Sequence, residues 1–510
     1  MSRNSFAKPV NGDPQSTTEG ITSFREKFKF VITHITVEPI VFSFIMISMM
    51  NNIVNQNLLL EKVCRVNLHW NESICDALVS RNKSGYLPHH EMEVQQFVVK
   101  WSAYRTVITG MFQVIGIIFL GSWSDRHRRR KPIILMPVIG ELIASIGLFL
   151  CSYFFLELPM EYAWMVDTFC AALFGGQCTL FLGVFSYVAG ISTEKDKTLR
   201  IGSVAISYSL ALTSGMFIGG ILLNRLGFLG CYSISISIAT SAIVYGFIII
   251  KEKTVKEKEE KKIGFLKDLF ALEHIKNTFR TCFQKREDNR RTKIIVLIFL
   301  CSMLVGPVQG ELNLTYMFLR LKFGWNEVDF SIYNALHSSV QTLGSVFALT
   351  VLSKYLKLDD AVLGIIAVVS KVSGCAIYAF APSGMFFYIG AIAELFFPTC
   401  FIAMRALMAK IVPTYELGQS NSVFGICEAL MPFFFGPIYS KIYIETIHVY
   451  AGTFFLFSVL LYTAALFSYI YLYRNRGRQA NGEFQEQEQT DFKKSRTNIA
   501  NEMNECEKRV

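Results

Sequence analysis

Twelve apolar segments recur along this 510-residue chain, and each is about as long as a lipid bilayer is thick. A helix needs about 20 mostly apolar residues to cross the hydrocarbon core of a membrane. The segments cover 36–58, 98–121, 132–154, 164–189, 200–223, 230–250, 294–316, 329–352, 360–380, 384–408, 420–441 and 449–472. We therefore predict an all-α membrane protein that crosses the bilayer twelve times.

The positive charge of the chain lies mainly in the segments between these runs. Residues 121–132 contain five basic side chains after a single acid, Asp125. Lys and Arg near the ends of membrane helices stay on the cytoplasmic side, so this segment orients the helices around it. The net charge of +10 therefore does not indicate nucleic-acid binding. The even number of crossings places both termini in the cytoplasm.

A long charged segment divides the crossings into two groups of six. In order, we expect a cytoplasmic N-terminus, a six-helix bundle, a cytoplasmic linker, a second six-helix bundle and a disordered cytoplasmic tail, over residues 1–35, 36–250, 251–293, 294–472 and 473–510. Apolar residues of the linker recur at helical spacing from Ile263 to Phe283, which predicts an amphipathic helix along the membrane surface. This helix is either a plain connector or a latch between the halves.

The segment over 59–97 is a long loop that the charge pattern places outside the cytoplasm. It contains two sequences for N-glycosylation, at Asn71 and Asn82. It also contains Cys64 and Cys75, and a disulfide between them and two free thiols are both compatible with the sequence.

The basic segment resembles a motif of the major facilitator superfamily of secondary transporters. Members have Gly-x-x-x-Asp-Arg-x-Gly-Arg-Arg between their second and third helices, and this chain matches it at Gly121, Asp125, Arg126, Arg129 and Arg130. Arg128 replaces the second glycine of the motif. The resemblance implies the superfamily fold and a cytoplasmic gate, in which Asp125 contacts Arg129 and the start of the eleventh helix near Ser420. The alternative is that the segment only sets the topology.

Four stretches extend the resemblance to the proton-coupled folate transporter family, a solute carrier family 46-like group. They are Val37–Phe42, Gly121–Asp125, Phe185–Ser192 with Thr198–Arg200, and Arg405–Val412 with Glu416–Gln419. The family implies transport of folate, of other organic anions or of bacterial cell-wall fragments. In the folate carrier a glutamate of the fifth helix couples protons, and Ala205 stands at the matching place here. Folate, and proton coupling through this position, therefore do not follow from the resemblance.

Ionisable and polar side chains lie deep within the apolar runs of the second half. Charges inside a membrane are costly and usually face a cavity, so these residues are functional candidates. The set comprises Lys371, Glu394, Arg405, Glu428, His337 and Gln341. Glu394 and Arg405 stand eleven residues apart, close to three helical turns, and would face the same way on one continuous helix.

Two interpretations of this set stay open. In the first, Arg405 and Lys371 attract an anionic substrate into a polar cavity of the second half, while Glu394, Glu428 or His337 exchanges the transported proton. In the second, ion pairs such as Lys371 with Glu394 or Glu428 only hold helices together, and His337 is a packing hydrogen-bond partner.

The first half contributes mainly polar candidates. Asn52 and Gln56 lie one turn apart on the first helix and are positioned to line the pathway, Gln177 lies near the middle of the fourth helix, and Tyr208 on the fifth can stack on a flat ring. Hydrogen bonding between helices is the alternative role for each. A Gly215-xxx-Gly219 pattern predicts close packing of the fifth helix against a neighbour.

These patterns together predict a secondary active transporter of small organic anions that works by alternating access and is driven by protons. The alternatives are an uncoupled carrier and a solute-sensing receptor with a transporter fold. The sequence has no phosphate-binding loop, metal-spaced cluster or nucleophile motif, so we expect no enzyme activity, cofactor or metal. The expected partners are the substrate, protons and the bilayer, without nucleic acid. We expect a monomer or weak oligomer in the plasma membrane or the lysosomal membrane.

Overall fold

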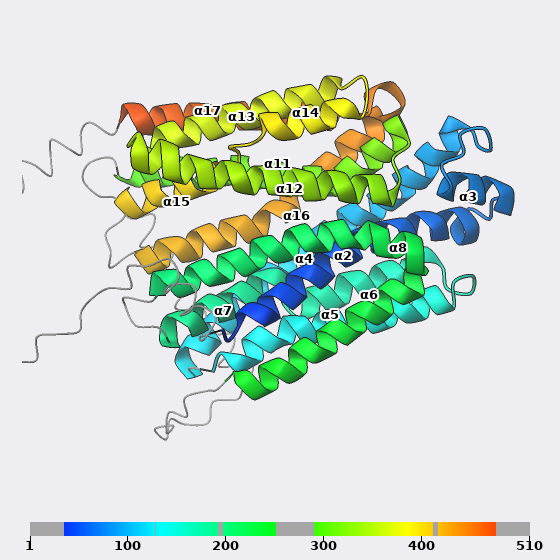
Figure 1. Cartoon of the computed structure of the whole chain (residues 1–510), viewed down its shortest axis with the longest axis horizontal. Coiled ribbons are helices and arrows are strands. Elements are labelled where there is room, and N and C mark those ends of the chain that lie inside the picture. Colours follow the sequence, from blue (N-terminus) through cyan, green and yellow to red (C-terminus); the bar gives the residue numbers. More distant parts are fainter. Residues whose placement is uncertain (1–34, 128, 192–196, 251–289, 412–416, 476–510) are drawn as a thin grey trace, which may run out of the picture.

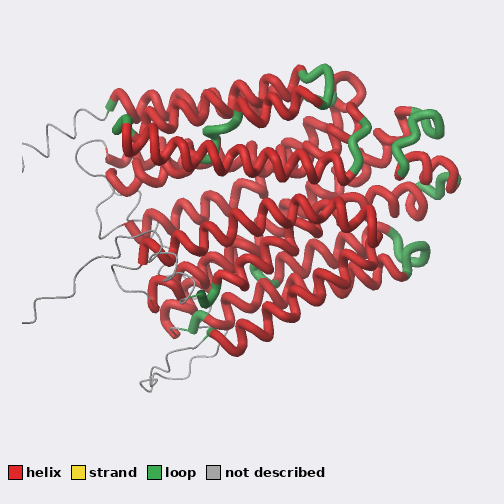
Figure 2. The backbone as a smooth tube through the Cα atoms, viewed as in Figure 1, coloured by secondary structure: helices red, strands yellow, loops and turns green. Residues whose placement is uncertain are grey.

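The computed structural model describes residues 35–127, 129–191, 197–250, 290–411 and 417–475, and helices make up nearly all of them (Figure 1). Figure 2 shows long helices joined by short loops, without a strand in these ranges. The predicted linker helix and the two polar termini lie outside the described residues.

The first half of the chain forms the lower group of helices in Figure 1. Its membrane helices are α2 (Glu38–Lys62), α4 (Pro88–His127), α5 (Lys131–Tyr153), α6 (Met160–Leu173), α7 (Gly176–Ile191) and α8 (Lys197–Ile249). α8 contains two crossings that meet at Gly227, whose φ of 65° lies in the left-handed region that favours glycine.

The second half forms the upper group in Figure 1. Its helices are α11 (Arg290–Phe323), α12 (Glu327–Phe347), η2 (Ala348–Tyr355), α13 (Asp360–Phe380), α14 (Met385–Ala393), α15 (Thr399–Ile411), α16 (Leu417–Tyr450) and α17 (Thr453–Arg474). The π-helical segment η2 continues α12 without a loop.

Length and hydropathy mark seven candidate membrane spans among the described residues. One of them, 200–249, is long enough for two crossings. The other four of the twelve predicted crossings correspond to α2, α4, α16 and the divided pair α14 and α15, which are more polar or interrupted. The two-bundle architecture is as predicted.

Two predicted membrane helices are broken near their middle, the fourth and the tenth, which are the fourth of each half. In the first half α6 and α7 are separated at Gly175 and Gly176, both with positive φ. In the second half α14 ends at its cap residue Glu394, and α15 begins after Pro398. The prediction of one continuous helix over 384–408 is therefore wrong, because proline disfavours helical geometry in the residue before it.

The break between α14 and α15 is joined to α13 by hydrogen bonds. The Ser370 hydroxyl donates to the Ala393 carbonyl at 2.5 Å and accepts from the Phe396 amide at 3.3 Å. Backbone polar groups inside a membrane need partners within the protein, since lipid offers none. α13 therefore supplies hydrogen-bond partners for two backbone groups of the broken helix.

The outer loop has a compact structure of its own at one end of the molecule. It consists of η1 (Val63–Asn67), α3 (Glu72–Val79) and the start of α4. Of the two alternatives for Cys64 and Cys75, a disulfide or two free thiols, the structure has the disulfide. Asn71 and Asn82 are both exposed on this loop, where a glycan would have room.

The predicted close packing of the fifth helix is present between α8 and α2. A Cβ atom added at Gly215 would lie 2.6 Å from the Met46 carbonyl oxygen, and one at Gly219 would lie 3.1 Å from the Met50 Cα. The two backbones therefore approach as closely as glycine allows.

We predict that Gly215→Ala destabilises the protein by about 1–3 kcal/mol relative to Gly202→Ala, because the added methyl overpacks the contact with α2. Gly202 is also on α8, and a Cβ there meets nothing within 4 Å, so its variant is the matched control. Unfolding of the purified protein in detergent measures both. Equal stability of the two variants would contradict the packing described above.

Candidate functional site

A cavity of about 720 Å³ lies between the two halves. Its wall comes mostly from α2, α4, α5, α6, α7 and α8 of the first half, and α11, α15 and α16 complete it. It extends to Val204 and Ala205 near the cytoplasmic start of α8. Pockets that enclose small solutes have volumes of about 300–1,000 Å³, so this cavity has room for one.

The second half places one ion pair in the cavity wall. Arg405 of α15 donates to Glu428 of α16 at 2.5 Å, and both residues line the cavity. The Arg405 side chain is 49% exposed, although the residue lies within a membrane helix. A guanidinium has five N–H donors, so Arg405 keeps further donors besides the one that binds Glu428.

The first half adds a second pair that the sequence analysis missed. Arg105 of α4 lies 3.1 Å from Asp167 of α6, and the Asn55 amide donates to the same carboxylate at 2.9 Å. Glu141 of α5 also lines the cavity and accepts from Asn51 at 3.3 Å. Arg105 and Asp167 lie in the predicted runs 98–121 and 164–189, so a search for charges within apolar runs would have found them.

The polar candidates of the first half lie at or next to the cavity. Asn52, Gln177 and Tyr208 line it, and Gln56 donates to Asn52 at 2.9 Å from a small adjoining pocket. The Tyr208 ring packs edge-on against Phe181 at 5.5 Å, which forms an aromatic wall toward the cytoplasmic end.

The remaining charged candidates gather away from the cavity, inside the second half. Lys371 of α13 donates to Glu394 and to Glu311 of α11, both at 2.8 Å. The His337 ring lies 3.1 Å from Glu394, and Gln341 lies 3.0 Å from His337.

Lys371 and Glu394 are buried, and neither lines the central cavity. The expectation that Lys371 attracts substrate in a cavity of the second half is therefore corrected, because two carboxylates already bind its ammonium group. Glu311 was not a sequence candidate, although it too lies within an apolar run. Two carboxylates and one ammonium leave this buried group one negative charge in excess when His337 is neutral, which low-dielectric surroundings disfavour.

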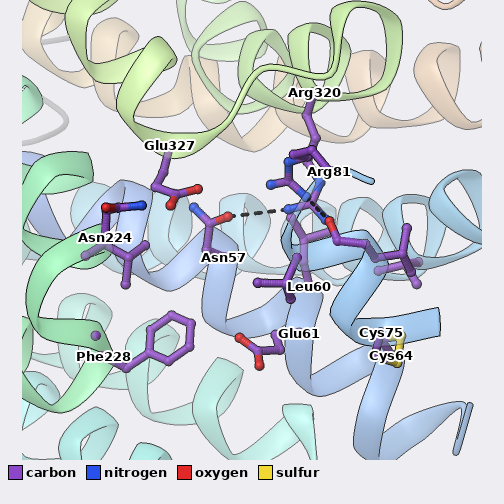
Figure 3. Close-up of a pocket in the computed structure, with 15 residues that line it drawn as sticks. Asn57, Leu60, Glu61, Cys64, Cys75, Arg81, Asn224, Phe228, Arg320 and Glu327 are labelled. Atoms are coloured by element: carbon purple, nitrogen blue, oxygen red, sulfur yellow. Dashed lines mark hydrogen bonds between the residues drawn. A yellow bond between two sulfur atoms is a disulfide. The ribbon is translucent and has the colours of Figure 1, made fainter. Parts of the chain in front are cut away.

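The two halves are bonded to one another at their outer ends. Arg320 of α11 forms a buried ion pair with Glu91 of α4 at 2.5 Å, and Tyr316 donates to Asn57 of α2 at 2.7 Å. Figure 3 shows Asn57 and Arg320 meeting beside an outer pocket. Burial tends to raise the pKa of Glu91, but the charge and hydrogen bonds of Arg320 hold that pKa below its ordinary value. The pair stays ionised, and the outer side is closed.

The predicted cytoplasmic gate is only partly described. The structure describes the backbone but not the side chains of residues 121–127, which include Gly121, Asp125 and Arg126, and the same holds for the start of α16 around Ser420. Of the same motif, Arg129 is exposed and Arg130 is the N-cap residue of α5. The gate therefore stays a prediction. Among the described residues no three His, Cys, Asp or Glu side chains are grouped to hold a metal ion.

Two helical lobes around a central cavity, with polar groups on the cavity wall and bonds across the outer end, define the class of membrane solute carriers. The family model described as the Major Facilitator Superfamily matches residues 94–436, most of the chain. This protein belongs to the Major Facilitator Superfamily, and it is an integral membrane transporter.

Several relatives belong to solute carrier family 46, which confirms the resemblance found in the sequence. The chain is 25% identical over 437 residues to the lysosomal proton-coupled steroid conjugate and bile acid symporter SLC46A3 of Gallus gallus, covering 83% of this chain and 91% of that protein. It is 21% identical to a probable peptidoglycan muropeptide transporter SLC46 of Drosophila melanogaster, covering 83% of each. It is 24% identical to the proton-coupled folate transporter of Bos taurus, covering 73% of this chain and 79% of that one.

Solved structures share the fold at lower identity. A POT family transporter in complex with 5-aminolevulinic acid superposes with a TM-score of 0.57 at 13% identity, covering 86% of this chain and 96% of that one. At this identity the similarity concerns the fold alone.

We predict that Lys371→Met destabilises the protein by about 3–5 kcal/mol, because it leaves Glu311 and Glu394 buried without their cation. Replacing both carboxylates by glutamine in the same variant should restore most of the loss. Lys354→Met, at an exposed position of η2, is the control and should change stability by less than about 0.5 kcal/mol. Thermal unfolding of the detergent-solubilised protein compares the three, and a stable Lys371→Met variant would refute the argument.

Proposed function

We propose that this transporter moves small organic anions by alternating access, and that protons drive the movement. The observation that supports this most directly is the half-exposed Arg405 in the cavity wall, bound to one carboxylate and facing the space between the lobes. Arginine suits this role because its planar group binds a carboxylate or sulfate through two parallel hydrogen bonds. The names of the relatives, which include steroid conjugates, bile acids and folate, fit an organic anion.

Glu428 competes with the substrate for Arg405 in this proposal. While Glu428 is ionised, its carboxylate holds one face of the guanidinium. A substrate anion binds more strongly when that carboxylate is protonated, since the cation then loses its internal partner. Proton binding and anion binding would therefore favour one another, as symport requires.

The buried group of Lys371, Glu311, Glu394 and His337 is the second candidate for the coupled proton. Its excess negative charge is removed when one proton binds, and His337 is the natural entry point because its side chain is 23% exposed while Glu394 is fully buried. Glu394 also ends α14 at the break before α15, the helix that holds Arg405. A change of charge at this break can therefore move Arg405 relative to the cavity.

One observation favours an uncoupled carrier instead. Ala205 lines the cavity at the place where the folate carrier has its coupling glutamate, so this chain presents a methyl group there. A receptor that binds a solute without moving it is the further alternative. The exposed sequons of the outer loop fit either the cell surface or the lysosomal lumen, and we propose one of these two membranes.

We predict that Arg405→Ala reduces uptake of an organic anion at least tenfold while the protein still reaches the membrane, because a charged hydrogen bond contributes about 1.5–3 kcal/mol. Arg405→Lys should keep part of the activity. Tracer uptake, divided by the amount of protein at the membrane, is the measurement. Normal uptake by Arg405→Ala would remove this residue from the mechanism, and binding without accumulation by the unaltered protein would favour the receptor.

We predict that uptake into proteoliposomes rises when the external pH is lowered, because protons then move inward with the anion. If the buried group binds the coupled proton, Glu394→Gln should lose most of this pH dependence, since it removes the excess negative charge that a proton would neutralise. Glu445→Gln, far from the cavity on the outer part of α16, is a control for the loss of a carboxylate. If uptake by the unaltered protein does not change after an imposed pH step, the result favours the uncoupled carrier.

A further inference from the structure

A second pocket of about 250 Å³ lies at the outer end of the molecule, separate from the central cavity (Figure 3). Both lobes contribute to it: α2, the outer loop, α4 and the Gly227 turn of α8 from the first half, and α11 and α12 from the second. Part of its wall is apolar, formed by Leu60, Leu78, Val79, Val94, Leu223 and Phe228.

Four charged side chains line this pocket, and two of them are already paired. Arg320 is bound to Glu91, and Glu61 is bound to Arg65 at 3.0 Å. Arg81 and Glu327 have no salt-bridge partner within the described ranges, so the pocket presents one unpaired cation and one unpaired anion. They come from opposite lobes, since Arg81 follows α3 and Glu327 begins α12.

Arg81 is held in an unusual conformation and forms no salt bridge within the described residues. Its φ of 60° is in the left-handed region, its Nη1 donates to the Leu78 carbonyl, and its Nη2 is 3.5 Å from the Tyr316 hydroxyl. Its Nε is buried without a hydrogen-bond partner in the described structure. Burial and the neighbouring charge of Arg320 lower the pKa of Arg81, and the carboxylates of Glu91 and Glu327 offset this only in part. An anionic group in the pocket would give Arg81 a direct countercharge.

The same pocket does not favour a plain anion or a plain cation. A carboxylate alone would gain from Arg81 but would be repelled by Glu327, and an amine alone would meet the reverse. A molecule with both charges satisfies both side chains, and its apolar body can pack against the leucine, valine and phenylalanine side chains of the wall.

We propose that the outer pocket binds a small zwitterion with an apolar side chain, an amino acid or a dipeptide, whose carboxylate meets Arg81 and whose ammonium group meets Glu327. Because both lobes touch such a ligand, and because they must separate when the central cavity opens outward, the bound zwitterion holds the outer end closed. The site is thus an external inhibitory site rather than a part of the transport pathway.

Binding to the full-length protein in lipid nanodiscs, measured by calorimetry at constant ionic strength, tests this proposal. The probes are L-phenylalanine and glycyl-L-phenylalanine, which offer one ring with two spacings between ammonium and carboxylate. The comparators are 3-phenylpropanoate, which lacks the amine, and 2-phenylethylamine, which lacks the acid. At least one zwitterion should bind saturably, and both comparators should bind about tenfold more weakly or worse, because each leaves either Arg81 or Glu327 without its partner.

Arg81→Gln and Glu327→Gln should each weaken the binding of the zwitterion about tenfold or more. Lys83→Gln, an exposed change in the same loop, should leave it unaltered, and so should Arg405→Ala, which affects only the central cavity. The proposal is overturned if neither zwitterion binds, if a comparator binds equally well, or if both pocket variants bind like the unaltered protein. Loss of binding in Arg405→Ala alone would place the ligand in the central cavity instead.

Discussion

The ion pair between Glu91 and Arg320 joins the two lobes at one end, and the form of the cavity depends on it. Both side chains are buried, and the hydrogen bonds of Asn57, Gln95, Tyr316 and Tyr443 surround the pair with further links between the lobes. A buried pair of this kind contributes modestly when intact but is costly to separate into single charges. Opening outward therefore requires that these bonds be replaced by water or by other partners.

The broken helices of the two halves show how the chain places polar groups inside a membrane. In the first half the break brings Gly176 and Gln177 to the cavity wall. In the second half it brings Glu394 to a buried ammonium group, and Ser370 of the same helix as Lys371 bonds to the interrupted backbone. The two breaks occupy matching helices but serve different purposes, since one exposes polar groups to the cavity and the other encloses them.

Much of the architecture follows from the sequence, because apolar length and basic loops are local signals. The twelve crossings, the close contact at Gly215 and the family needed no tertiary information. The grouping of charges did not follow in the same way. The sequence around Lys371 is the same whether its side chain faces a solute or two carboxylates. Only the packing of α11, α13 and α14 shows which of these two surroundings it has. The sequence pattern did not identify Arg320 and Glu91, because they lie just beyond the apolar runs.

The disulfide between Cys64 and Cys75 ties the end of the first membrane helix to the short helix that precedes Arg81. Thiols stay reduced in the cytosol, so this bond can form only after the loop has crossed into an oxidising compartment. The loop that presents Arg81 to α11 is therefore completed by the secretory pathway rather than at the ribosome. Protein molecules that stay in a reducing environment would have the same helices. Their two lobes would be joined less tightly at the outer end, because the disulfide would be missing.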